Sequence, residues 1–184
     1  MVPLQRPIEN AYVVPGTRLS AGEYPGMAWG TPQAMRDVRL LAFLDAGLTA
    51  FIDLTHPDDP LDQYAPRLYE LAAARGVPVV HDYLSIVDMD VCDRAHMTRV
   101  LDTIDQRLSE GHGVYVHCWG GVGRTGMTVG CWLARHGLSG DAALERVRAL
   151  FGTMSAQKLR RFGPDGSPQT EEQRAVVRGW SAAG

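Results

Sequence analysis

Residues 114–126 read Val114-Tyr115-Val116-His117-Cys118-Trp119-Gly120-Gly121-Val122-Gly123-Arg124-Thr125-Gly126, and they are the most informative segment of the chain. Residues 114–116 are β-branched or aromatic and follow a glycine, which is typical of a buried strand. Residues 125–135 are mostly apolar and contain no proline, so they predict a helix. The chain therefore carries a cysteine from a strand into a glycine-rich loop that opens a helix.

The loop between that strand and that helix has the composition of an anion-binding site. Gly120, Gly121 and Gly123 lack a Cβ and permit dihedral angles in which successive N–H groups turn inward as a nest. The helix adds its unpaired N–H groups and the positive end of its dipole. Arg124 offers a planar fork that matches two phosphate oxygens. These surroundings also favour a thiolate at Cys118, so the stretch predicts a nucleophilic sulfur beneath a bound phosphate.

The pattern His-Cys-x5-Arg-Thr at 117–125 resembles the signature loop of the cysteine-dependent protein tyrosine and dual-specificity phosphatases. The resemblance implies that Cys118 attacks phosphorus and that Thr125 donates a hydrogen bond to the departing thiolate. It also implies that His117 supports the loop and is not a base. The residues expected to bind the phosphate are Trp119, Gly120, Gly121, Val122, Gly123 and Arg124. A nucleotide-binding loop is excluded, because that motif needs a lysine and the chain's only lysine is Lys158.

Attack by a thiolate on a phosphate ester needs an acid that protonates the leaving oxygen. In the family that the signature resembles, this acid lies on a mobile loop upstream of the cysteine, often within Pro-Ile-x-Asp. Here Ser85-Ile86-Val87-Asp88 matches that segment, with serine in place of proline. Asp88 is therefore the first candidate and Asp90 the alternative, whereas Asp93 is expected to cap the following helix.

The segment Gln169-Thr170-Glu171-Glu172-Gln173 gives a second point of resemblance. Tyrosine-specific phosphatases carry Gln-Thr-x-x-Gln near the C-terminus, where the first glutamine orients the hydrolytic water. The resemblance assigns that role to Gln169 and a supporting role to Gln173. A polar helix start capped by Thr170 is the alternative interpretation of the same residues.

Outside the signature, helical patterns alternate with short apolar strands. A strand or hairpin is expected near residues 12–19. Further strands are expected at 49–54 and 77–83, and helices at 32–46, 66–75, between Asp93 and Gly111, and at 125–135, 141–150 and 170–180. Residues 155–167 are expected to form a basic loop. The alternation is typical of an α/β fold with a central, mainly parallel sheet flanked by helices, and the resemblance implies a phosphotyrosine-phosphatase-like arrangement.

Two details of the helix at 32–46 are also expected from the pattern. Thr31 is expected to cap it, with Pro32 in the first turn. The buried face is expected to hold Met35, Val38, Leu41 and Leu44.

Composition limits the remaining choices. With 184 residues, 45% hydrophobic and 21% charged, the chain is typical of a globular protein, and we expect 1–184 to be a single phosphatase domain. A net charge of −3 makes nucleic acid and anionic membranes unexpected partners. No apolar run suits a signal peptide or a membrane span. Three scattered cysteines suggest neither a disulfide framework nor a metal site, so we expect no cofactor and a cytoplasmic location.

The expected activity is hydrolysis of phosphate monoesters on proteins through a phosphocysteine intermediate. Phosphotyrosine is the expected substrate, with or without phosphoserine and phosphothreonine, and a small phosphomonoester is the other expected partner. An inositol phosphate or phosphoinositide phosphatase is an alternative, but the uncharged x5 stretch disfavours ligands with several phosphates. A non-catalytic phosphate-binding module is a second alternative, although nucleophile, arginine and acid are all present.

Overall fold

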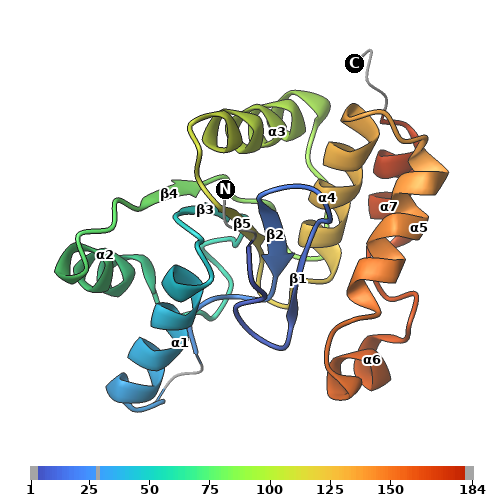
Figure 1. Cartoon of the computed structure of the whole chain (residues 1–184). Coiled ribbons are helices and arrows are strands. Elements are labelled where there is room, and N and C mark those ends of the chain that lie inside the picture. Colours follow the sequence, from blue (N-terminus) through green and yellow to red (C-terminus); the bar gives the residue numbers. More distant parts are fainter. Residues whose placement is uncertain (1–3, 28–29, 181–184) are drawn as a thin grey trace.

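A computed structural model describes residues 4–27 and 30–180 of the chain (Figure 1). The strands are β1 (Ala11–Val13), β2 (Leu19–Gly22), β3 (Ala50–Asp53), β4 (Val80–Tyr83) and β5 (Val114–His117). The helices are α1 (Gln33–Asp45), α2 (Ala65–Ala74), α3 (Arg94–Ser109), α4 (Gly123–Arg135), α5 (Gly140–Phe151), α6 (Ala156–Phe162) and α7 (Glu171–Arg178).

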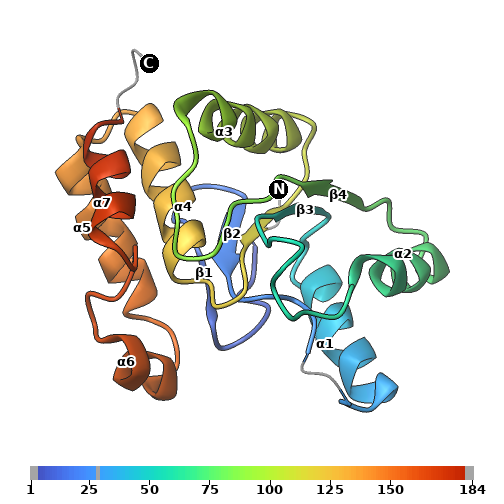
Figure 2. The same ribbon diagram turned by 180° about the vertical axis from the view of Figure 1, so that it is seen from behind.

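These strands form one sheet in the order β1-β2-β5-β3-β4, with helices on both sides (Figures 1 and 2). All neighbours are parallel except β1 and β2, which form an antiparallel hairpin. The signature strand β5 is therefore central, and both of its neighbours run in its direction. The expected α/β fold with a mainly parallel central sheet is confirmed.

Side chains alternate between the two faces of the sheet, as the period of a strand requires. Phe51 and Tyr115 point to the face covered by α1 and α2, where both rings pack against Phe43. Ile52 and Val116 point to the opposite face, into the core shared with α3, α4 and α5. Because both faces are buried, β3 and β5 are apolar along most of their length, as their sequences show.

The expected buried face of α1 is wrong in part. Leu44 is buried, together with Leu40 and Phe43, but Met35 and Val38 are 55% and 69% exposed. Most residues of this helix are apolar, so its pattern did not single out the face that packs against α2 and the sheet. The expected Thr31 cap is also wrong, because Pro32 occupies the N-cap position and α1 has no side-chain cap.

Residues 155–167 are not one continuous loop, since they contain α6. Ser155 caps this helix by accepting a hydrogen bond from the N–H of Lys158. Seven residues make too few turns for an apolar period to stand out in the sequence. Asp93 caps α3 as expected, and Thr170 caps α7 in a capping box with Gln173.

Candidate active site

The candidate site lies where four parallel strands end together. The register pairs His117 with Gly22 of β2 and with Asp53 of β3, and Asp53 with Tyr83 of β4. The loops that leave these strands therefore meet at one edge of the sheet, which is where open α/β sheets bind their ligands. Cys118 follows β5 directly, and α4 begins five residues later.

Cys118 lies at the base of the loop formed by residues 117–126, the signature loop. Its side chain is buried, with 3% of the residue exposed. The hydroxyl of Thr125 donates to Sγ at 3.1 Å, which stabilises negative charge on the sulfur. The structure thus brings these two expected catalytic residues together.

The backbone of the signature loop has the donors that the sequence predicts. Among the described residues, none accepts a hydrogen bond from the N–H groups of residues 119–124. Gly121 adopts a φ of +68°, and a Cβ there would overlap the backbone of Gly22. Only glycine fits this position, because the loop lies directly against the end of β2.

Arg124 is fixed along one edge of its guanidinium group. Nη1 donates to the Asp59 carboxylate at 2.8 Å and to the Ile86 carbonyl at 3.0 Å. Nε and Nη2 are buried and hydrogen-bond to no described residue, although Nη2 lies 2.8 Å from Oδ1 of Asp88. Burial alone would lower the pKa of Arg124, but Cys118 and Asp59 raise it, so the fork stays charged. Its second edge can bind two oxygens of a phosphate.

Asp59 is a candidate site residue that the sequence did not single out. Its side chain is 5% exposed and holds Arg124, whereas the neighbouring Asp58 is 92% exposed. The signal was a pair of aspartates shortly after β3, at the sheet edge where parallel strands end. Residue type cannot distinguish the two, because burial depends on how this loop folds back over Arg124.

Asp88 lies on a turn between β4 and α3, next to Arg124. Its side chain is 50% exposed, so it faces solvent and the site together. Met89 follows with a φ of +63°, an uncommon conformation for a residue other than glycine. The carboxylate of Asp90 instead accepts a hydrogen bond from the N–H of Val91. The geometry thus favours Asp88 over Asp90 as the acid.

Gln173 connects three parts of the site. Its Oε1 accepts from the N–H groups of Gln169 and Thr170, and its Nε2 donates to the Asp90 carbonyl at 3.0 Å. The side chain is fully buried and lies against Gly123. Gln173 thereby connects residues 85–90, which carry both acid candidates and are called the acid loop below, and the start of α7 to the signature loop.

A pocket of about 370 Å³ opens above Cys118. Its lining residues include Asp88, Met89, Trp119, Val122, Phe162 and Gln169. Trp119 is 44% exposed and also lines the neighbouring cavity of about 400 Å³ beside Tyr24. Cys118, Asp88 and Gln169 therefore line one pocket whose walls are partly aromatic.

His117 is fully buried behind the signature loop. Its Nε2 lies 2.7 Å from the Tyr64 hydroxyl and its Nδ1 lies 3.4 Å from the Cys118 carbonyl oxygen. Burial lowers the pKa of His117 to about 4, although the nearby Asp53 opposes this effect. The ring is therefore neutral at pH 7, which suits a support of the loop.

The buried His117 makes stability depend on pH. The unfolded chain protonates this histidine near pH 6.5 and the folded chain only near pH 4. Between these values the unfolded state binds more protons, so stability falls as pH falls. We expect a loss of about 3 kcal/mol across this range, at about 1.4 kcal/mol per pH unit.

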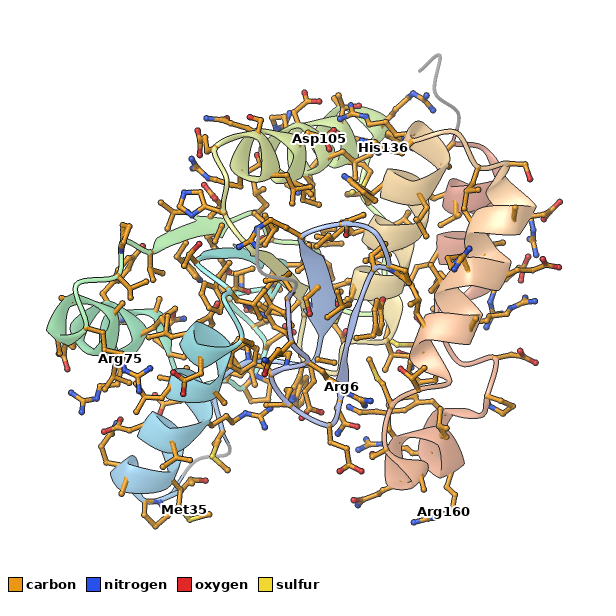
Figure 3. The ribbon with its side chains drawn as sticks, viewed as in Figure 1. Arg6, Met35, Arg75, Asp105, His136 and Arg160 are labelled. Carbon is orange, nitrogen blue, oxygen red and sulfur yellow. The ribbon has the colours of Figure 1, made fainter. Side chains whose placement is uncertain are left out.

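Chemical denaturation at several pH values measures this dependence. The His117→Asn protein should lose most of the slope between pH 6.5 and 5. Below pH 5, carboxylates whose pKa the fold lowers, such as those of Asp53 and Asp37, add a slope of the same sign. His136→Asn is the matched control, since His136 is an exposed residue at the end of α4 that lies near Asp105 (Figure 3). An unchanged slope in His117→Asn would assign the pH dependence to other groups.

The comparison with family models identifies the class of protein. Residues 24–177 match the model PTP-SAK, described as Swiss Army Knife protein, DSP-PTPase phosphatase domain. The chain therefore belongs to this family and is a cysteine-dependent phosphatase of the dual-specificity and tyrosine phosphatase class. The match covers the signature loop, the acid loop and both glutamines. No curated protein sequence matches the chain.

Solved structures share the fold. A variant of Tk-PTP is 24% identical with a TM-score of 0.65, and the match covers 92% of each chain. PTPMT1 in complex with PI(5)P is 20% identical with a TM-score of 0.63, again over 92% of each chain. P. aeruginosa TpbA in complex with pTyr is 20% identical with a TM-score of 0.63, over 97% of this chain and 89% of that one.

Two further observations concern metals and membranes. Within residues 4–27 and 30–180, no group of three or more His, Cys, Asp or Glu side chains is placed to hold a metal ion. In the same residues, none of the helices combines the length and the apolar character that crossing a membrane requires.

Proposed function

We propose that this protein hydrolyses phosphate monoesters on proteins, with phosphotyrosine as the preferred substrate. The observation that carries the proposal is the set of donors around Cys118: six backbone N–H groups and the Nε–Nη2 edge of Arg124, none of which hydrogen-bonds to a described residue, although Nη2 is ion-paired with Asp88. Such a set is built for the three equatorial oxygens of a phosphoryl group.

The proposed reaction has two steps. The Cys118 thiolate attacks phosphorus, the bond from phosphorus to the ester oxygen breaks, and Asp88 gives its proton to that oxygen. Water, oriented by Gln169, then attacks the phosphocysteine and gives a proton to Asp88. The bond from phosphorus to sulfur breaks, and the hydroxyl of Thr125 stabilises the thiolate that leaves.

The charges around the pocket support a substrate with a single phosphate. Lys158 and Arg161 line the pocket, but so do Glu23 and Asp88. Lys158 is ion-paired with Glu23 at 2.8 Å. The walls also include Trp119 and Phe162, which suit an aromatic ring. These features favour a phosphotyrosyl side chain, such as the pTyr bound to TpbA, over the lipid headgroup bound to PTPMT1.

Two further parts of the proposal concern the whole chain. We propose that residues 1–184 act as one phosphatase domain, since the family match already extends over most of them. We also propose a cytoplasmic location, because a reducing compartment keeps the thiols of Cys92, Cys118 and Cys131 free.

Substrate preference tests the proposed function. We expect kcat/KM for a phosphotyrosine peptide to exceed that for the matching phosphoserine peptide and for phosphatidylinositol 5-phosphate by at least about 10-fold, roughly the discrimination of one well-fitted pocket contact. Phosphate release from each substrate at equal concentration is the measurement. Faster hydrolysis of the lipid would replace the protein phosphatase proposal by the phosphoinositide one. Release from none of the three would support a non-catalytic binding module.

A further inference from the structure

Lys158, the only lysine of the chain, lies against the signature loop. It belongs to α6, the short helix at the same end of the molecule as the start of α4 (Figure 1). Its side chain is 11% exposed. Nζ donates to the carbonyl oxygen of Gly120 at 2.9 Å and to Oε2 of Glu23 at 2.8 Å. Its charge is thus neutralised by one partner while it binds the loop backbone.

The hydrogen bond to Gly120 sets the orientation of a loop peptide. In a trans peptide the C=O and the next N–H point in opposite directions. A carbonyl of Gly120 held by Lys158 therefore turns the N–H of Gly121 to the other side of the peptide plane. That N–H is one of the donors that bind no described residue.

Two neighbouring peptides of the loop are held in the same way. The carbonyl of Trp119 accepts from the N–H of Tyr24 at 3.0 Å. The carbonyl of Val122 accepts from the hydroxyl of Ser167 at 2.8 Å. Of these three hydrogen bonds, the one to Gly120 has a charged donor. Its acceptor belongs to a glycine, whose backbone conformation is the least restricted by sterics.

The position of Lys158 is itself fixed by a polar cluster. Glu23 accepts from Arg39 at 2.9 Å and from the side chain of Asn10 at 3.1 Å. Oδ1 of Asn10 accepts in turn from the N–H of Ser155, the residue that caps α6. The cluster joins the end of β2 to the start of α6, so the Lys158 amine is held where the Gly120 carbonyl needs it.

We propose that Lys158 is a positioning residue for phosphate binding. It holds the Gly120 carbonyl away from the anion, so that the N–H of Gly121 stays aimed at a phosphate oxygen. This inference rests on the proposed function only in requiring that the signature loop binds a phosphate. It assigns to Lys158 a role in binding and catalysis without contact to the reacting atoms.

The test measures binding of inorganic phosphate by titration calorimetry in the Cys118→Ser background. We expect Lys158→Met to weaken phosphate binding about 10-fold, the typical effect of losing one hydrogen bond to a charged group. Lys158→Arg restores a charged donor and should bind within about 3-fold of the parent. Arg160→Met is the matched control, because Arg160 is exposed on the same helix and points away from the loop (Figure 3).

Chemical modification gives an independent test that needs no substitution at position 158. The amines that acetic anhydride can acetylate are that of Lys158 and the N-terminus, since the chain has one lysine, and the Lys158→Arg protein controls for acetylation of tyrosine and cysteine side chains. Acetylation should weaken phosphate binding about 10-fold in the parent and should not change it in Lys158→Arg. The thermal midpoint is recorded for each protein, so that loss of binding is compared between folded proteins.

The outcomes separate this inference from the proposed function. Weakened binding in both Lys158→Met and the acetylated parent, with Arg160→Met unchanged, supports it. Unchanged phosphate binding after either change overturns it. A parent protein that binds phosphate poorly at any concentration overturns the proposed function itself. For the active enzyme, the same loss should appear in kcat/KM for p-nitrophenyl phosphate.

Discussion

The Cys118→Ser protein is expected to hydrolyse p-nitrophenyl phosphate at least about 10⁴-fold more slowly than the parent protein, since a serine hydroxyl is a much weaker nucleophile than the cysteine sulfur of the proposed reaction. The donors around the site remain, because they come from the backbone of residues 119–124 and from Arg124. The variant should therefore still bind phosphate. Initial rates of nitrophenol release and calorimetry with phosphate measure the two effects separately.

Cys92→Ser is the control for this experiment. Cys92 is half-buried beside the acid loop and does not line the pocket above Cys118. Its replacement should leave the rate within about 3-fold of the parent. Equal rates in Cys118→Ser and the parent would end the covalent mechanism. A loss of phosphate binding as well as of hydrolysis in Cys118→Ser would show that the sulfur also holds the loop in shape.

Asp88→Asn should lower kcat for a phosphotyrosine peptide by about 10²–10³-fold, within the usual range for a general acid. An amide cannot protonate the leaving phenolate oxygen. p-Nitrophenolate leaves far more readily, so the loss with p-nitrophenyl phosphate should be smaller. The ratio of the two losses, measured from steady-state kcat, identifies the acid more surely than either loss alone.

Asp90→Asn is the matched comparison, because it makes the same chemical change two residues away. Asp90 contacts the site through its backbone carbonyl, which accepts from Gln173, and that contact survives the substitution. We expect a change below about 3-fold for both substrates. A large loss in Asp90→Asn with little loss in Asp88→Asn would reverse the assignment of the acid.

The local parts of this protein could be predicted from the sequence. Strand β5, the signature loop and α4 are contiguous, so residue type and spacing were enough to predict the strand, the glycine turn and the helix that follows. The caps of α3 and α7 are also local, because Asp93 and Thr170 bind N–H groups three residues away. Parallel pairing of the central strands followed from their alternation with helices.

The sequence-based predictions that were wrong or missing concern features that depend on contacts between distant segments. The buried face of α1 was wrong in part because its apolar residues surround the helix, and packing against α2 and the sheet decided which of them are covered. The short α6 gave no periodic signal of its own. Asp59 and Asp58 are chemically identical, and only the fold of their loop over Arg124 distinguishes them.

Residue type and spacing were enough to predict an α/β protein with a cysteine, an arginine and a threonine around one anion-binding loop, because these residues are neighbours along the chain. Which groups hold that loop in shape depends on contacts between distant segments. Asp59 lies 65 residues before Arg124 and Lys158 lies 38 residues after Gly120. Residues so far apart meet only when the sheet brings its strand ends to one edge, and no local pattern records such a meeting.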